Sequence, residues 1–242
     1  MEISKLLQVI WIIIGKTVSL KKVLLMPQQP TQQLFIYRMT HIDNVPFIVQ
    51  NGLWSKLSPV QDPNFVPIGN PAIIDKRTNK SVPVPSGGVL GEYVPFYFSG
   101  HSPMLYNITT GYGVKRFFQK EIVFLVCDAM EIVNAGIPYC FTDGNATTAI
   151  SNFYHTLDWL RELDWTCIRA TIWKNTEDDY DRVRKKMSEF LVKDHVPADL
   201  IRGMIVKNSE VEQKVAAMLG DTLPDCKIKV DTEYEYYYRN YD

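Results

Sequence analysis

A glutamate at the junction between a charged segment and an apolar run is the residue of this chain best placed for chemistry. Glu189 follows the basic stretch 182–186 and directly precedes the apolar residues 190–192. Acidic residues at 177–181 lead the basic ones, an order that the helix macrodipole favours. A carboxylate at such a helix-to-strand junction would point from the edge of a core into a cleft. The plainer alternative is a solvated glutamate, since most glutamates are exposed.

Four further polar or aromatic residues stand at positions where side chains of a site would gather. His41 ends a strand-like apolar run, Arg77 lies in a long polar segment, Tyr97 lies in an aromatic strand, and Asn145 lies in a glycine turn at 143–145. The planar fork of an arginine pairs well with phosphate oxygens. Each residue also has an ordinary interpretation: a strand-end histidine, a solvated arginine, a core tyrosine and a turn asparagine.

The elements that must position these residues form a mixed pattern. Apolar runs predict strands at 34–39, 93–98, 122–126, 190–192 and 200–206, and alternation predicts one at 168–173. Residues 227–230, together with 234–238, are expected to form the final strand. Helical spacing predicts helices at 42–50, 152–163, 177–187 and 211–218. Polar, proline-containing or glycine-containing segments predict loops over 55–88 and 132–151. Because strands and helices do not alternate regularly, we expect one α+β domain over residues 34–242.

Composition and charge limit the class of protein. The chain of 242 residues is 46% hydrophobic with a formal net charge of −1, which describes a globular protein. A nucleic-acid binder of this composition must therefore use a local basic patch. The four cysteines are widely spread and form no C-x-x-C pair, so the sequence predicts neither a disulfide framework nor a zinc site. A reduced, cytoplasmic compartment and no metal are expected.

The first 33 residues are expected to form an N-terminal extension. The apolar stretch 6–14 is shorter than the roughly 20 residues that cross a bilayer, so no stable membrane association is expected. It could serve as the apolar region of a signal peptide, yet no clear cleavage site follows it. The favoured interpretation is that the working protein begins at Met26.

Common catalytic motifs are absent. The sequence contains no phosphate-binding Walker A loop, no G-x-G-x-x-G after a strand, no H-E-x-x-H and no G-x-S-x-G. These absences remove the main sequence support for P-loop, Rossmann, zinc-protease and α/β-hydrolase chemistry.

Four blocks of sequence, in order, resemble the DarT family of DNA ADP-ribosyltransferase toxins. They lie at 37–45, at 93–98 with 102–106, at 141–146 and at 188–192. The resemblance implies an ADP-ribosyltransferase-like fold with a central, antiparallel-rich split sheet, flanking helices and long active-site loops. It also implies NAD as co-substrate, release of nicotinamide, and transfer of ADP-ribose to thymidine, or less favourably guanosine, in single-stranded DNA. A macrodomain antitoxin, DarG, and a monomeric state belong to the same expectation.

Carried over onto this sequence, the family's functional residues fall on definite positions. The catalytic residues are expected to be Glu189 and Arg77. The NAD-binding residues are expected to be Met39, Thr40, His41, Gly52, Arg77 and Tyr97, and the DNA-binding residues Met104, Arg116, Asn145 and Arg184. The sequence departs from the family at two points. Asn145 stands where the family's turn often has histidine, and Met187-Ser188 stands where Gln-Ala is common.

The implied chemistry suits these residue types. Breaking the nicotinamide glycosidic bond develops positive charge on the ribose, which a carboxylate on the 2′-hydroxyl would stabilise. The acceptor base must lose a proton, and Arg77 is the candidate that the resemblance provides. The alternatives are an RNA-directed enzyme of the same fold, such as a tRNA 2′-phosphotransferase-like enzyme, and an inactive nucleic-acid-binding module. The basic residues that either form a strand-tracking patch or serve as helix-end charges are Lys115, Arg116, Arg182, Arg184 and Lys186.

Overall fold

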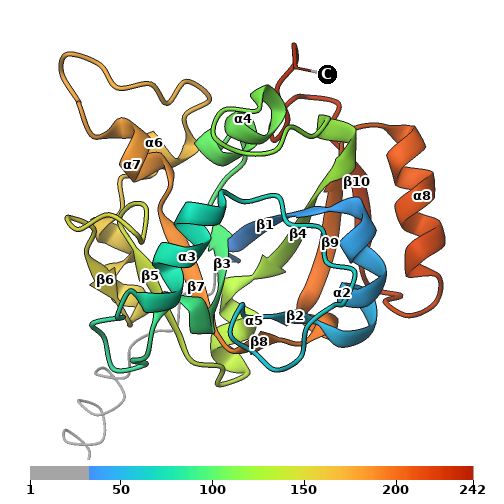
Figure 1. Ribbon diagram of the computed structural model, residues 1–242, viewed down its shortest axis with the longest axis horizontal. Helices are drawn as coiled ribbons and strands as arrows, with labels where there is room; N and C mark the ends of the chain where they lie inside the picture. Colours follow the sequence, from blue (N-terminus) through green and yellow to red (C-terminus); the bar gives the residue numbers. More distant parts are fainter. Residues whose placement is uncertain (1–32, 242) are drawn as a thin grey trace, which may run out of the picture. The chain divides into compact units, whose positions relative to one another are not determined.

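The computed structural model describes residues 33–241, and an eight-stranded sheet lies at the centre of this part of the chain (Figure 1). The strand order is β10-β9-β4-β1-β3-β7-β5-β6. β9 and β10 pair in parallel, whereas the other neighbouring strands pair antiparallel. The expected α+β class with an antiparallel-rich sheet is confirmed. The predicted extension lies outside the described residues, apart from Gln33.

The strands of the large sheet are β1 Phe35–His41, β3 Tyr93–Tyr97, β4 Ile122–Asp128, β5 Tyr139–Thr142, β6 Phe153–Tyr154, β7 Glu189–Lys193, β9 Ile201–Val206 and β10 Lys227–Val230. A small second sheet pairs β2 Leu53–Trp54 with β8 His195–Val196. The α-helices are α2 Val45–Asn51, α3 Pro71–Asn79, α4 Pro103–Thr110, α5 Ala129–Asn134, α6 Trp165–Arg169, α7 Arg182–Lys186 and α8 Ser209–Leu219.

The large sheet is split between β1 and β3. Among the described residues of these two strands, one pair lies opposite each other in the antiparallel pairing, Tyr37 and Tyr97. β1 pairs with β4 along its whole length, and β3 pairs with β7 from Tyr93 to Tyr97. Across the split, the Arg38 guanidinium Nη1 donates a hydrogen bond of 3.0 Å to the Pro95 carbonyl oxygen. The sheet therefore consists of two halves that meet near Tyr37 and Tyr97.

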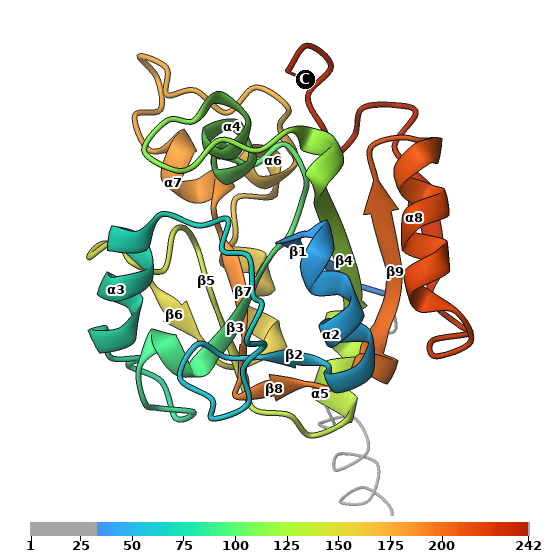
Figure 2. The ribbon, with the colours of Figure 1, turned by 45° about the vertical axis from the view of Figure 1, so that its right-hand side comes forward.

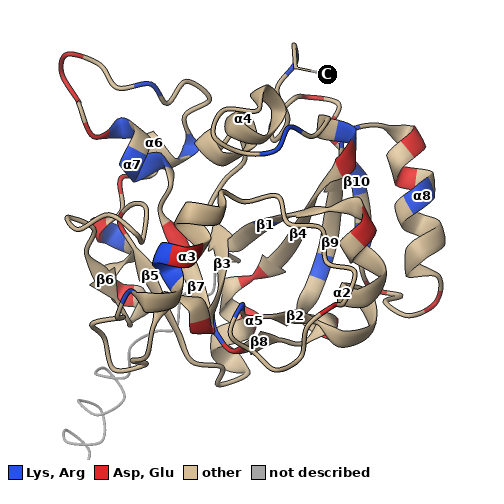
Figure 3. Cartoon of the chain, in the orientation of Figure 1, with Lys and Arg blue, Asp and Glu red and all other residues tan. Residues whose placement is uncertain are grey.

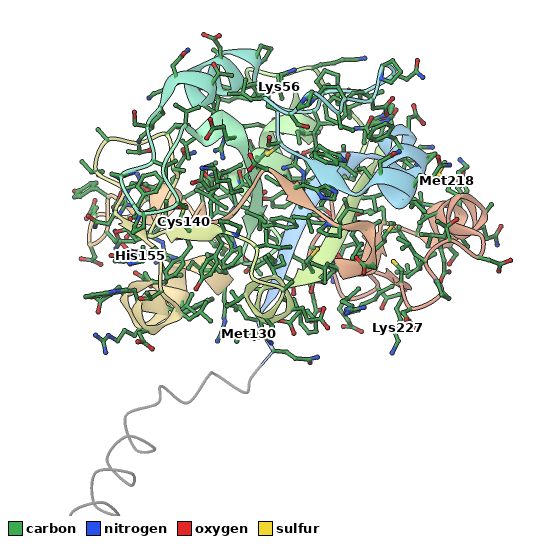
Figure 4. All side chains as sticks on the ribbon, turned by 90° about the horizontal axis from the view of Figure 1, so that it is seen from below. Lys56, Met130, Cys140, His155, Met218 and Lys227 are labelled. Carbon is green, nitrogen blue, oxygen red and sulfur yellow. The ribbon has the colours of Figure 1, made fainter. Side chains whose placement is uncertain are left out.

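Alternating side chains bury both faces of the sheet. On β4, Val123 and Leu125 enter the largest core cluster, whereas Ile122 and Phe124 enter a second cluster on the other face. Helices α2 and α8 contribute their apolar residues to the largest cluster and pack together beside β9 (Figure 2). A third cluster surrounds Cys140 of β5, which is labelled in Figure 4.

The segment predicted as a loop over 55–88 contains helix α3, so that part of the prediction is wrong. Asn70 caps the helix by accepting hydrogen bonds from the N–H groups of Ala72 and Ile73, and Pro71 occupies its first position. No residue of α3 is buried, so the helix has no apolar stripe that periodicity could detect.

Other boundaries also differ from the prediction. The expected loop at 132–151 contains part of α5 and all of β5. The expected helix at 152–163 is the short strand β6 followed by a 3-10 helix, Leu157–Glu162, and the expected strand at 168–173 overlaps the end of α6. Helix α7 is shorter than expected. The aromatic residues 234–238 form no strand, because the Asp231 carboxylate accepts backbone hydrogen bonds from Glu235, Tyr236 and Tyr237 and turns the chain there.

The described residues contain no helix that is long and apolar enough to cross a bilayer. The four cysteines, all described, are free thiols.

Candidate active site

Glu189 is buried at the first position of β7, with 2% of its surface exposed. Its Cα partner across the sheet is Tyr97, the last residue of β3. Strand alternation directs Glu189 away from Phe190, which enters the largest core cluster, and toward the face that Leu191 shares. The interpretation of Glu189 as a solvated glutamate is therefore wrong.

The Glu189 carboxylate is held by one hydrogen bond on each oxygen. Arg77 Nη1 donates to Oε2 at 2.9 Å, and the Ala146 backbone N–H donates to Oε1 at 2.8 Å. The Glu189 backbone N–H in turn donates to Thr142 Oγ1 at 3.3 Å. Hydrogen bonds to an ionised acceptor are stronger than neutral ones. The orientation of the carboxylate is therefore defined by α3 and by the loop after β5.

Arg77 reaches Glu189 from the last turn of α3. Its side chain is 15% exposed, so it is not a solvated loop charge. Its second terminal nitrogen, Nη2, is buried and has no hydrogen-bond partner in the described structure. Such a buried donor costs about 1–3 kcal/mol when it stays unpaired. The guanidinium therefore has an N–H group that no acceptor in the described residues satisfies.

A second guanidinium, that of Arg38 on β1, belongs to the same charge cluster. Burial lowers the pKa of Arg38 to about 10, and the neighbouring Arg77 cation acts in the same direction. Tyr97 and Glu189 oppose this shift. Burial and the Glu189 charge also raise the pKa of the Tyr97 phenol. Two cations thus share one carboxylate, an arrangement that favours an anionic ligand.

The predicted NAD-binding residues at the end of β1 are all buried. Met39 joins the second core cluster, and the Thr40 hydroxyl accepts a hydrogen bond from Asn44 Nδ2 at 3.0 Å. His41 Nδ1 accepts the Asp43 N–H at 3.2 Å, which caps the turn after the strand. Gly52 ends α2 with φ 75°, and a Cβ there would collide with the Val196 carbonyl oxygen. Binding of NAD by these residues stays a prediction.

The four predicted DNA-binding residues lie on helices α4 and α7 and in two loops. Met104, on α4, accepts a hydrogen bond from the Tyr97 hydroxyl, with 3.7 Å between Oη and Sδ. Arg116 donates through Nε to the Thr109 carbonyl oxygen at 3.0 Å. Asn145 lies in the loop next to Glu189. Their contacts to DNA stay predictions.

Arg184 and Lys186 of α7 are engaged by the protein itself. The Arg184 guanidinium pairs with Asp143 and Asp181, and 14% of its side chain is exposed. The Lys186 ammonium is buried and donates to Ser99 Oγ and to the carbonyl oxygens of Ile168 and Ala170. Figure 3 shows the basic α7 beside acidic residues of the loop that precedes it. Lys186 is therefore not part of a surface patch that could track DNA.

The model of one protein family matches residues 37–238, and that family is described as "ssDNA thymidine ADP-ribosyltransferase, DarT". The chain belongs to the DarT family. A DNA ADP-ribosyl transferase of Escherichia coli O127:H6 is 39% identical over 189 residues, which cover 78% of this chain and 87% of the relative. A Thermosipho africanus fusion of DNA ADP-ribosyl transferase and DNA ADP-ribosyl glycohydrolase is 27% identical over 188 residues, covering 77% of this chain and 46% of the fusion.

Solved structures of a DarT from Thermus sp. 2.9 have the same fold. Its complex with ADP-ribosylated single-stranded DNA superposes with a TM-score of 0.76 at 32% identity, covering 85% of this chain and 96% of that one. Its NAD+ complex has a TM-score of 0.71 at 33% identity, covering 85% and 98%. The DarT resemblance and the enzyme class, an NAD-dependent DNA ADP-ribosyltransferase with NAD as co-substrate, are thereby confirmed.

Three contributors to the site are not among the residues that the sequence predicts. The signal for Arg38 is that a single cation inside an apolar strand is unusual. Thr142 and Ala146 act through a hydroxyl oxygen and a backbone N–H, to which residue type gives no guide. The structure brings Glu189, Arg77 and Tyr97 together from three elements, as expected.

Proposed function

We propose that this protein transfers ADP-ribose from NAD to the base of thymidine, rather than guanosine, in single-stranded DNA and releases nicotinamide. In this proposal it acts as the toxin of a toxin–antitoxin pair. The observation that carries the proposal is the buried Glu189 carboxylate, held by Arg77 at 2.9 Å and by the Ala146 N–H at 2.8 Å.

Glu189 would stabilise the transition state. As the bond between ribose C1′ and the nicotinamide nitrogen breaks, its electron pair leaves with nicotinamide and positive charge develops on the ribose. A fixed carboxylate that accepts the ribose 2′-hydroxyl strengthens its interaction as this charge grows. Because Arg77 and Ala146 already orient Glu189, little reorganisation is needed at that moment.

The two guanidiniums suit the anionic part of NAD. Arg77 has a buried Nη2 group without a partner, and Arg38 has a buried Nε group without one. The diphosphate of NAD offers acceptor oxygens, and a guanidinium pairs with phosphate better than a point charge does. Arg77 would hold the diphosphate, while Arg38 adds positive charge behind it. The unpaired N–H groups of these two guanidiniums support a site for the diphosphate of NAD here.

The acceptor would be the imide nitrogen of thymine. Its N–H proton must leave as the nitrogen forms the new bond to ribose C1′, so the site needs a base or a cation that lowers the pKa of that proton. Arg77 is our candidate for this role. A guanidinium beside the imide would stabilise the developing anion, and the proton would pass to solvent.

An antitoxin partner is part of the same proposal. The Thermosipho africanus relative carries its transferase and a DNA ADP-ribosyl glycohydrolase in one chain. This supports a partner protein that removes ADP-ribose from the modified DNA. We expect this partner to be a macrodomain antitoxin of the DarG type.

Mass spectrometry of modified oligonucleotides tests the proposal. Single-stranded DNAs that contain only thymidine or only guanosine as the variable base are incubated with NAD and the protein. We expect an ADP-ribose adduct on the thymidine oligonucleotide, reduced about 100- to 1000-fold by Glu189→Gln. Glu210→Gln is the matched control, because Glu210 is an exposed glutamate that pairs with Lys214 on α8.

Two results would overturn it. With RNA oligonucleotides incubated in parallel, an adduct confined to RNA would favour the RNA-directed alternative. Oligonucleotide binding without any adduct, in a sample shown to be folded, would favour the inactive binding module.

A further inference from the structure

The loop that follows β5 delivers a backbone donor to the catalytic carboxylate. Within this loop, the Ala146 N–H donates to Glu189 Oε1 at 2.8 Å. A backbone N–H fixes the position of a carboxylate only if the loop that carries this N–H is itself fixed in position. The contacts that fix residues 143–147 therefore decide the position of Glu189.

Arg184 contacts this loop at three successive residues. Its Nη1 donates to Asp143 Oδ1 at 2.8 Å, and its carbonyl oxygen accepts the Asn145 N–H at 3.1 Å. Between these two contacts the side chain packs over Gly144, where an added Cβ would lie 2.8 Å from Arg184 Cγ and 2.9 Å from Cζ. Any residue larger than glycine at position 144 would therefore collide with the Arg184 side chain.

The guanidinium of Arg184 is itself held in place by two carboxylates. Asp181 accepts from Nε at 2.8 Å and 2.9 Å and from Nη2 at 2.6 Å. Nη1 also reaches Ser151 Oγ at 3.2 Å, at the far end of the loop. Hydrogen bonds to Asp181 and Asp143 raise the pKa of Arg184, so the side chain is charged at all physiological pH values. Little of its donor capacity remains for DNA phosphates.

Asp143 links the two ends of the loop that follows β5. It accepts the Asn152 backbone N–H at 3.0 Å and Asn152 Nδ2 at 2.7 Å, which ties the start of the loop to its end. The ion pair between Asp143 and Arg184 is largely buried, with 15% and 14% of the side chains exposed. Breaking a buried pair leaves an uncompensated charge, so the loop depends on both partners.

We propose that Arg184 is a positioning residue for the transfer reaction: it clamps the loop 143–147, whose Ala146 N–H orients Glu189. This inference rests on the proposed function, and it differs from a role of Arg184 as a DNA phosphate contact. A positioning residue acts on the turnover of the bound complex. A phosphate contact acts on DNA affinity and on its dependence on salt.

Two variants disturb the clamp by independent routes. Arg184→Gln removes the charge, whereas Gly144→Ala leaves every charge in place and pushes the Arg184 side chain away. We expect each variant to lower kcat about 10- to 100-fold at saturating NAD and single-stranded DNA, because small displacements of a catalytic group have effects of this size. The Kd for DNA and its salt dependence should change less than twofold. Arg161→Gln is the matched control, because Arg161 is 71% exposed.

A double-variant cycle tests whether Asp143 and Arg184 act through the same contact. Asp143→Asn and Arg184→Gln should each lower kcat, and the double variant should be no worse than the more impaired single variant. Circular dichroism at the assay temperature selects the folded variants. Unchanged kcat in both Arg184→Gln and Gly144→Ala would overturn the proposal while leaving the wild-type transferase activity intact. A weakened DNA Kd with a shallower salt dependence and normal kcat would overturn it as well.

Discussion

Asn145 and Met187 contact each other: the Asn145 side-chain amide lies 3.7 Å from the Met187 sulfur. Both residues depart from the pattern that the sequence resemblance to the DarT family leads us to expect. Asn145 Oδ1 is occupied by the N–H and the hydroxyl of Thr147, at 2.9 Å and 2.6 Å, so the amide group is directed toward Met187. The two departures therefore form one packed contact at the loop 143–147, which contacts Glu189 through the Ala146 N–H.

A variant cycle at this contact should reveal coupling. We expect Asn145→His and Met187→Gln to lower kcat/KM more when made singly than when combined, because each single change leaves one partner unmatched. Coupling between contacting residues is about 0.5–3 kcal/mol. Kinetics of the four proteins on a thymidine oligonucleotide measure it. Strictly additive effects on kcat/KM would show that the contact between Asn145 and Met187 does not contribute to activity.

Replacing Arg77 by lysine should weaken NAD binding. Lysine keeps the positive charge near Glu189 but loses the planar fork that pairs with phosphate oxygens. We expect the Kd for NAD to rise about tenfold or more, which corresponds to about 1.4 kcal/mol. Isothermal titration calorimetry measures this. Lys76→Gln changes an exposed neighbour on the same helix and should leave the Kd unchanged.

The buried Lys186 ammonium predicts a dependence of stability on pH. Burial lowers its pKa from 10.5 to about 8. Between these values the unfolded chain binds more protons at this site than the folded chain, so this site's contribution to stability rises as pH increases from 8 to 10.5. The slope is at most about 1.4 kcal/mol per pH unit.

Comparison with Lys186→Met isolates this effect from other groups that titrate in the same range. We expect the free energy of unfolding of wild type minus that of the variant to become more favourable to wild type from pH 8 to pH 10.5. Urea denaturation at several pH values provides the data. A flat difference would show that the pKa of Lys186 is not lowered in the fold, and a difference that falls with pH would show that it is raised.

The turn after β10 should depend on the charge of Asp231. Its carboxylate accepts three backbone N–H groups, from Glu235, Tyr236 and Tyr237, each at 2.9 Å. In Asp231→Asn one oxygen becomes an amide nitrogen, which cannot accept. We expect a loss of about 1–3 kcal/mol in the free energy of unfolding. Urea denaturation should show a lower midpoint with an unchanged slope, and Glu233→Gln, at an exposed site nearby, should show neither change.

The sequence by itself determined the elements that carry their own pattern of burial. β1, β3, β4, β7 and β9 were predicted because their apolar runs are buried on the sheet, and α8 because one face of it packs on the core. The four sequence blocks also identified the family, since they record functional constraints at fixed spacing. Glu189 was found in this way.

Only the tertiary structure decided the contacts that make the site. α3 has no buried residue, so no periodicity revealed it, yet it brings Arg77 to Glu189 across 112 residues of sequence. The ion pair of Arg184 with Asp143 spans 41 residues, and the split that Arg38 bridges follows from the sheet order. The physical reason is that local patterns report how an element is buried along its own length. Strand register and loop packing, which bring distant residues together, depend on the whole fold.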